Sequence, residues 1–215
     1  NYCNTVNLPL YTIPWETRIV DITYELCHHI ITDEKINKNR ADTFIFAINN
    51  PLKEEAYKPE LEKEGFTDGE KYAFAAVKID TANEEIRENI ARSLRYSMAG
   101  ILNEFTRKYS IVDMDKYVIV VCQGISAADF ENSIKEQTEV LNSTFSDSGI
   151  CVGIAPYETD GNKLSKAYRL ACGTSKLAKS YNKTFLRYND IGMYKLLMEV
   201  DEKSSLMNYY DDCLG

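Results

Sequence analysis

The order of buried strands and amphipathic helices between residues 71 and 155 constrains the fold of this 215-residue chain more than any other feature. The apolar stretch KYAFAAVKI, at 71–79, is typical of a strand buried on both faces. Helical and strand patterns then continue the order strand, helix, strand, strand, helix, strand. This is the order of the split βαβ, or ferredoxin-like, motif. We therefore predict an α+β fold, a two-layer sandwich in which an antiparallel ferredoxin-like sheet carries flanking helices.

Two crossover helices are expected within this motif. Asn83 is placed to cap the first one. The apolar face of that helix should consist of Ile86, Ile90, Leu94, Met98, Ile101 and Phe105. The second should bury Phe130, Ile134, Leu141 and Phe145. Together these two helices can cover one face of the sheet.

The remaining strands are short. Stretches 109–112 and 117–122 should pair as a hairpin, 149–155 should be a further buried strand, and 184–188 a last strand. These strands are apolar on both sides, so the second face of the sheet also needs a cover. A helix over 161–180, capped by Asp160, and the helices before residue 71 are the candidates.

Three helical segments are predicted before residue 71. The first begins at Thr17 or Asp21 and continues past Ile30, and a second apolar patch surrounds Phe44, Ile45 and Ile48 and ends at Pro51. Residues 53–64 form a charged, solvated helix closed by Gly65. An extended segment is expected over residues 1–15.

Composition limits the location and the partners of the chain. Lys and Arg number 25 against 33 Asp and Glu, a formal charge of −8, which argues against a nucleic-acid surface spread over this segment. We find no signal peptide and no apolar run long enough to span a membrane. None of the six cysteines forms a CxxC pair, so we predict a cytoplasmic protein with free thiols. Cys122, Cys151 and Cys172 lie in apolar stretches and should be buried.

Three aspartates occupy positions that are metal sites in some enzymes with this strand order. Nucleotide cyclases and polymerase palms hold divalent metals with acids at the end of the first strand and in the central hairpin. Asp80 ends the first strand here, and Asp113 and Asp115 lie in the hairpin. The hairpin has no glycine to admit a nucleotide close to its backbone, and Lys78 places a cation beside Asp80. We therefore interpret the three acids as turn residues and expect no catalytic residue, metal or cofactor.

The other candidate motifs give no support to catalysis. His28 and His29 point about 100° apart on a helix, so they do not converge on one ion, and one of them is expected to pack inward. The spacing GxxxxGK[ST] of a phosphate loop is absent. No GxSxG or HExxH occurs, and two adjacent histidines leave a Ser-His-Asp arrangement with little support.

The block at 151–197 resembles the PucR/CdaR family of bacterial transcription regulators. It contains the strand VGIA at 152–155, a helix with the pattern SKAYRLA at 165–171, and the closing element YNDIGMYKLL at 188–197. The family usually has glycine in place of Ala155 and leucine in place of Ile191. The stretch LPLYTIPWETRIVDITYEL, near the start of the chain, is similar to the end of the N-terminal domain of purine-catabolism regulators.

The resemblance implies three parts. Residues 1–70 would be an extended segment and helical linker after a PucR-type N-terminal domain. Residues 71–188 would be a degenerate GGDEF-like regulatory domain, and 189–215 coupling helices that lead to a C-terminal helix-turn-helix in a longer protein. The GGDEF signature would fall at the hairpin, where the residues Asp-Met-Asp-Lys of 113–116 do not match it. No catalytic residue is carried over.

The closing element has a physical role that can be argued without the family. Asp190 is placed to cap a helix, and Gly192 would allow close approach to a neighbouring element. Met193, Leu196 and Leu197 form a stripe that would dock this helix. Interdomain coupling is accordingly assigned to Asp190, Gly192, Tyr194, Leu196 and Leu197. A simple terminal packing helix explains the same pattern equally well.

We therefore predict a non-catalytic sensory and dimerisation region of a PucR-family regulator. Two-fold operators are usually read by dimers, so a homodimer is expected. A helix through Met207 and Tyr210 would lead to the domain that binds operator DNA. A purine derivative or a sugar acid would be the effector, and no membrane contact is expected. Two alternatives stay open: a cyclase-like enzyme using Asp80, Asp113 and Asp115 for metal, and a purely structural dimerisation scaffold.

Overall fold

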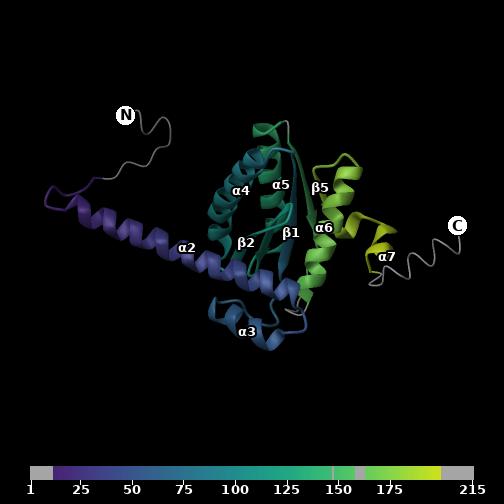
Figure 1. Ribbon diagram of the computed structural model, residues 1–215, viewed down its shortest axis with the longest axis horizontal. Helices are drawn as coiled ribbons and strands as arrows, with labels where there is room; N and C mark the ends of the chain where they lie inside the picture. Colours follow the sequence, from purple (N-terminus) through teal and green to yellow (C-terminus); the bar gives the residue numbers. More distant parts are fainter. Residues whose placement is uncertain (1–11, 147, 158–162, 200–215) are drawn as a thin grey trace, which may run out of the picture. The chain divides into compact units, whose positions relative to one another are not determined.

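A computed structural model describes residues 12–146, 148–157 and 163–199 (Figure 1). The chain forms two compact units, one that ends at Asn39 and one that begins at Arg40. The predictions for Asp160 and for the helix through Met207 and Tyr210 lie outside the described residues, as does most of the predicted extended segment.

Helix α2 is a single helix where two apolar patches were predicted. It comprises Ile19–Asn49, a run of 31 residues. No glycine or proline interrupts this sequence, so nothing in it ends the first predicted patch before the second begins. Asn50 and Pro51 follow its end, as expected for a proline that cannot continue a helix.

The sheet has five strands in the order β2-β3-β1-β4-β5. The strands are β1 (Ala73–Asp80), β2 (Tyr109–Met114), β3 (Tyr117–Cys122), β4 (Gly149–Ile154) and β5 (Phe185–Arg187). The pairs β1–β3, β1–β4 and β2–β3 are antiparallel, whereas β5 lies parallel to β4. The predicted α+β fold and ferredoxin-like strand order are confirmed.

Helices α4 (Glu84–Phe105) and α5 (Ala127–Thr144) cover one face of the sheet. The side chain of Asn83 accepts hydrogen bonds from the amides of Glu85 and Ile86, at 2.9 and 3.3 Å, which confirms the predicted cap. The buried stripe of α4 consists of Ile90, Ala91, Leu94, Met98 and Leu102. Ile86 and Phe105 are exposed and Ile101 is only partly buried, so the predicted face is corrected at both ends. Residues four apart lie on the same side of a helix, so the side that starts at Ile90 continues to Leu102 and not to Ile101.

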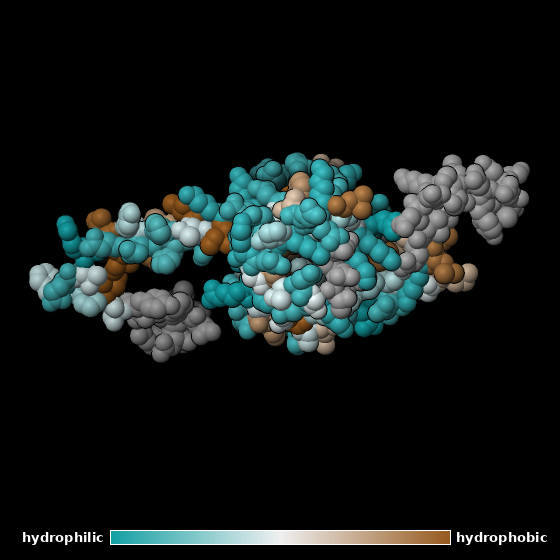
Figure 2. Space-filling view, turned by 90° about the horizontal axis from the view of Figure 1, so that it is seen from below, coloured by the Kyte–Doolittle hydropathy of each residue, from teal (hydrophilic) through white to brown (hydrophobic). Residues whose placement is uncertain are grey.

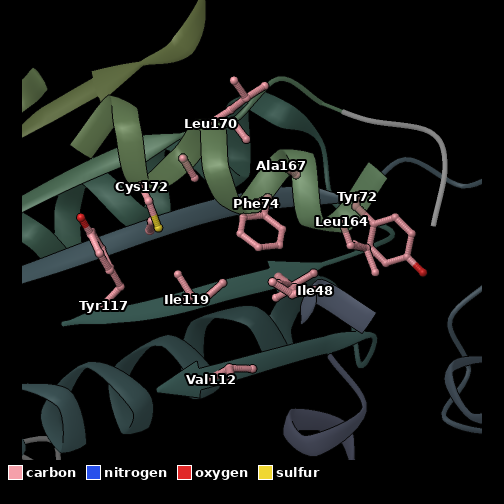
Figure 3. Packing of buried hydrophobic residues seen from close by; sticks show 14 of the residues in the cluster. Ile48, Tyr72, Phe74, Val112, Tyr117, Ile119, Leu164, Ala167, Leu170 and Cys172 are labelled. Atoms are coloured by element: carbon pink, nitrogen blue, oxygen red, sulfur yellow. The ribbon is translucent and has the colours of Figure 1, made fainter. Parts of the chain in front are cut away.

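Helix α6 (Leu164–Ser180) covers the other face, as predicted. Figure 3 shows Leu164, Ala167 and Leu170 of this helix over Phe74 and Ile119 of the sheet. The end of α2 completes the same core through Phe44, Ala47 and Ile48. Helix α3 (Glu54–Lys63) adds Tyr57 and Leu61, so the helix predicted to be solvated is buried along one side.

Gly153 sets how closely α6 approaches the sheet. A Cβ at this position would lie 2.8 Å or less from three backbone atoms of α6, which belong to Ala171, Thr174 and Ser175. Only a residue without a side chain lets the helix backbone pass at that separation. The glycine inside the strand VGIA is therefore a packing residue.

The described chain ends in a short exit segment. A 3₁₀ helix, η2 (Tyr188–Asp190), follows β5, and helix α7 (Tyr194–Glu199) comes next. None of the helices among the described residues combines the length and apolar character needed to cross a membrane.

Candidate functional site

The three candidate aspartates lie at one edge of the sheet. Strand β1 ends at Asp80, which is paired in register with Gly149 at the start of β4. The turn between β2 and β3 lies at the same edge, since the amide of Ile79 donates to the carbonyl of Lys116 at 3.4 Å. Asp113 and Asp115 therefore come to the edge that the sequence predicted for them.

The sheet places Asp80 and Asp113 on opposite faces. Residues of β1 alternate between the two faces of the sheet. Phe74 and Ala76 belong to the core under α6, so Asp80, an even number of residues further along, points to the same α6 face. In β2, Val112 faces that same core, so Asp113 turns to the α4 face. Two carboxylates on opposite sides of a sheet do not converge on one ion.

Asp80 forms an ion pair with a lysine from α6. Its carboxylate accepts a hydrogen bond from Lys179 Nζ. That hydrogen bond holds the pKa of Asp80 below its ordinary value, and the nearby charges of Lys78 and Lys116 act in the same direction. Asp80 is thus surrounded by lysines in the position where a cyclase would bind a metal cation.

Asp113 and Asp115 are also explained without a metal. The carboxylate of Asp113 accepts a hydrogen bond from Arg95 of α4 at 2.7 Å. Asp115 has a φ of +53°, the left-handed conformation that aspartate tolerates better than most residues, and it completes a tight turn without glycine. Among the residues that the structure describes, no three His, Cys, Asp or Glu side chains are grouped as metal ligands would be.

The two histidines are both exposed on α2. Their ring centroids lie 6.3 Å apart and their planes are nearly perpendicular. The prediction that one of them packs inward is wrong, because this part of the helix has no buried face among the described residues.

The apolar-flanked cysteines are buried free thiols, as predicted. Burial raises the pKa of Cys122, and it raises that of Cys172 to about 12. A thiol with such a pKa is protonated at neutral pH and is a poor nucleophile. Cys27 is exposed on α2, and Cys3 and Cys213 lie outside the described residues.

A small pocket lies at the opposite edge of the sheet. Its volume is about 80 Å³, and its walls come from β1, α5, the end of β4 and the residues after it, the end of β5 and the start of η2. Phe130, Tyr157 and Tyr188 supply aromatic wall, while Glu131, Arg187 and Asn189 supply polar groups. The Tyr157 hydroxyl donates to the carbonyl of Ile125, which anchors one side.

Arg187 supplies the positive charge of this pocket. Its guanidinium lies 3.4 Å from Glu131 of α5 and 2.7 Å from Asp190 of η2. The Glu131 contact is long for a charge-assisted hydrogen bond, so a ligand carboxylate can compete with it. The pocket therefore combines apolar walls with an arginine, which is a common arrangement for small acids.

The closing element is arranged differently from the prediction. Asp190 is the last residue of η2 and accepts from Arg187, and it does not cap α7. Gly192 has a φ of +57° and a Cβ there would touch nothing within 4 Å, so its role is the left-handed turn and not close approach. Met193, Leu196 and Leu197 are exposed, with Leu196 at 70%, so they do not form the docking stripe.

Other side chains hold the exit segment in place. Ile191 is buried, and Tyr194 packs edge-on against Tyr181 at the end of α6. Met198 reaches α6 beside Gly173, where an added Cβ would lie 2.9 Å from its methyl group. The sequence of a helix this short does not show which of its apolar residues face inward, because the helix can pack in more than one orientation.

Four residues with clear structural roles were not predicted from the sequence: Lys179, Arg95, Arg187 and Gln123. Gln123 is fully buried, and its side chain accepts from the amide of Thr67 and donates to the carbonyls of Thr67 and Glu70. A glutamine directly after the apolar run YVIVVC was the one available signal, since a polar residue at the end of a buried strand needs partners.

Comparisons with known proteins give only distant likeness. No protein-family model and no curated protein matches the chain. Among solved structures it is similar to a microbial GGDEF domain studied with cyclic di-GMP, with 15% identity and a TM-score of 0.43 over 62% of this chain and 86% of that one. It is also similar to the coiled coil and GGDEF domain of DgcB from Caulobacter crescentus in complex with c-di-GMP. That match has 12% identity and a TM-score of 0.41 over 79% and 97% of the two chains.

Proposed function

We propose that this chain is the non-catalytic regulatory region of a PucR/CdaR-type transcription regulator. In this proposal it binds a small effector, forms a homodimer in the cytoplasm, and relays its state to a DNA-binding domain of the longer protein. The observation that carries the non-catalytic part is the division of Asp80 and Asp113 between the two faces of the sheet, each in an ion pair. Metal-assisted phosphoryl transfer needs carboxylates that converge on the same ion.

The pocket supports the sensory part of the proposal. Arg187 lines it directly before the exit segment, and Tyr188 and Asn189 line it at the start of that segment, for which we predict a coupling role. A ligand that takes Arg187 away from Glu131 or Asp190 would alter the start of this segment. The coupling role of Asp190, Gly192, Tyr194, Leu196 and Leu197 stays a prediction.

The size of the pocket favours one class of effector. A volume of about 80 Å³ is roughly half of the ~150 Å³ cavity that holds a benzene ring. Both kinds of ligand would require the pocket to open, but a bicyclic purine would require more opening than glycerate, the three-carbon member of the sugar acids. Its carboxylate would pair with Arg187, and its hydroxyl groups would face Glu131 and Asn189.

The enzymatic alternative is tested directly. The purified chain is incubated with GTP or ATP and either Mg²⁺ or Mn²⁺, and the products are separated by chromatography. We expect the nucleotides to be recovered unchanged. A cyclic mononucleotide or dinucleotide that forms in proportion to protein concentration would overturn the non-catalytic reading.

The sensory part is tested by thermal shift with sugar acids, purines and ureides. A ligand that binds only the folded state stabilises it by about 2.7 kcal/mol at one hundred times its Kd. We expect a saturable shift with a small hydroxy acid that is lost in Arg187→Met. It should be retained in Lys135→Met, which removes an exposed cation from the same helix as Glu131. No saturable shift with any compound would favour the purely structural scaffold.

A further inference from the structure

The first half of α2 exposes an unusual number of large apolar side chains. Between residues 12 and 39 no described side chain is fully buried, and only Ile22 and Ile36 are partly buried. The exposed apolar residues of this stretch of helix are Ile19, Val20, Tyr24, Leu26, Ile30 and Ile31. Figure 2 shows such hydrophobic residues at the surface of this helix. A lone helix of this length is marginal in water, because most helical stability comes from packing of an apolar face.

We propose that residues 19–37 pair with the same residues of a second copy as a parallel, in-register, two-stranded coiled coil. This inference rests on the proposed homodimer and names its interface. The seam follows coiled-coil spacing, with the alternating core positions d and a occupied by Ile19, Thr23, Leu26, Ile30, Asp33 and Asn37. The stretch is about 28 Å long at the rise of an α-helix.

The residue types at these positions favour two parallel strands. Ile30 at an a position and Leu26 at a d position are the combination preferred by parallel dimers. Asn37 at an a position specifies register and two-strandedness, since its amide pairs with its symmetry mate. Leu26 and Ile30 are 58% and 57% exposed in the single chain, so a partner has side-chain surface left to bury.

The residues beside the seam agree with a second copy as the partner. The outer positions opposite the seam carry Asp21, His28 and Lys35, which remain in water. In a parallel pair, His29 lies opposite Glu34 of the second copy, where the imidazole can donate to the carboxylate. Val20 and Ile22 flank the seam and widen its apolar part, whereas Tyr24 and Ile31 fall outside it.

Asp33 is the weak point of this interface. Two copies in register bring two Asp33 carboxylates to the same d layer, where like charges repel. The contact should therefore be strongest between residues 19 and 30. Asp33→Leu should tighten the dimer at least tenfold in Kd, as measured by sedimentation equilibrium. Leu26→Asp should weaken it by at least the same factor.

Cysteine cross-linking tests the register. The background replaces Cys3, Cys27 and Cys213 by serine and leaves the buried thiols of Cys122, Cys151 and Cys172. Under mild oxidation we expect Leu26→Cys and Ile30→Cys to give a disulfide-linked dimer. His28→Cys and Lys35→Cys, on the outer side of the same helix, are the matched controls and should remain monomers on a non-reducing gel.

The outcomes separate this inference from the proposed function. A strict monomer at all concentrations contradicts both the homodimer and the coiled coil. A dimer that resists Leu26→Asp and does not cross-link at positions 26 and 30 overturns the coiled coil alone. A tetramer, or equal cross-linking at seam and outer positions, also overturns it. Nucleotide turnover is an independent measurement, so the non-catalytic proposal stands or falls separately.

Discussion

Gly153 shows how one residue sets the distance between a helix and the sheet. Gly153→Ala would push a Cβ into backbone atoms of Ala171, Thr174 and Ser175. Backbone atoms, unlike side chains, cannot move away by changing rotamer. Overpacking of this kind costs about 1–3 kcal/mol, and we expect the upper end of that range because the obstructing atoms are backbone. Urea denaturation of the variant measures the loss.

Gly100→Ala is the matched control for that substitution. Gly100 lies inside α4, and a Cβ there would meet nothing within 4 Å. Alanine is the better helix former by roughly 1 kcal/mol, so this variant should be as stable as the parent or more so. Equal destabilisation by both substitutions would show that Gly153 is not a close-packing residue.

Gln123 fixes the loop before β1 to the end of β3. Gln123→Leu fills a similar volume but leaves the amide of Thr67 and the carbonyls of Thr67 and Glu70 without their side-chain partner. An unsatisfied buried polar group costs about 1–3 kcal/mol. Thr67 is exposed and Glu70 is only partly buried, so water can replace part of these hydrogen bonds, and we expect a total loss of about 1–3 kcal/mol in the free energy of unfolding. Hydrogen exchange should also be faster at Thr67, and an unchanged rate would contradict this role.

The ion pair of Asp80 predicts a specific acid dependence. The folded-state pKa of Asp80 lies below its ordinary value of 3.8, so the pair contributes stability above pH 3.8 that is lost as pH falls through the folded pKa. Lys179→Met removes the main cause of the lowered pKa. We expect a smaller fall in Tm between pH 6 and pH 3 in that variant than in the parent.

Lys183→Met is the comparison for Lys179→Met, since it removes an exposed lysine just beyond the same helix. Its Tm should fall between pH 6 and pH 3 as much as that of the parent. The same pH response in both variants would show that the Asp80–Lys179 pair has no influence on stability.

At the scale of elements, α7 docks by a different side from the one its leucines suggest. Met198 contacts α6 at Gly173, whereas Leu196 is exposed. Met198→Ala should release α7 and increase hydrogen exchange at its amides. The unfolding of the sheet domain, which is the compact unit that begins at Arg40, should change little. Leu196→Ala should leave the exchange of α7 unchanged. The reverse result would restore the predicted leucine stripe.

At the scale of the whole molecule, the sheet domain should not depend on the first 39 residues. Both described cores draw on residues from Phe44 onward, and the compact unit begins at Arg40. A chain that begins at residue 40 should keep the near-UV circular dichroism and urea midpoint of the sheet domain while it loses self-association. Failure of this shortened chain to fold would show that the first unit contributes to the stability of the second.

The sequence by itself determined the order of the elements. Buried strands, amphipathic helices, the Asn83 cap and the turn at Asp115 follow from local periodicity and local hydrogen bonding, which a single stretch of chain records. The prediction was still wrong at α2, where two helices were expected and one is present, because two apolar patches in one uninterrupted helix look like two helices in the sequence. The burial of Cys122, Cys151 and Cys172 could also be predicted from the apolar residues next to them in the sequence.

Only the tertiary structure decided what the candidate site can do. Asp80 and Lys179 are 99 residues apart in the chain, and no local pattern states that they meet. The alternation of side chains across the sheet then separates Asp80 from Asp113, although both reach the same edge. The orientation of α7 and the pocket around Arg187 likewise depend on which distant surfaces pack together, because one short helix can present several faces.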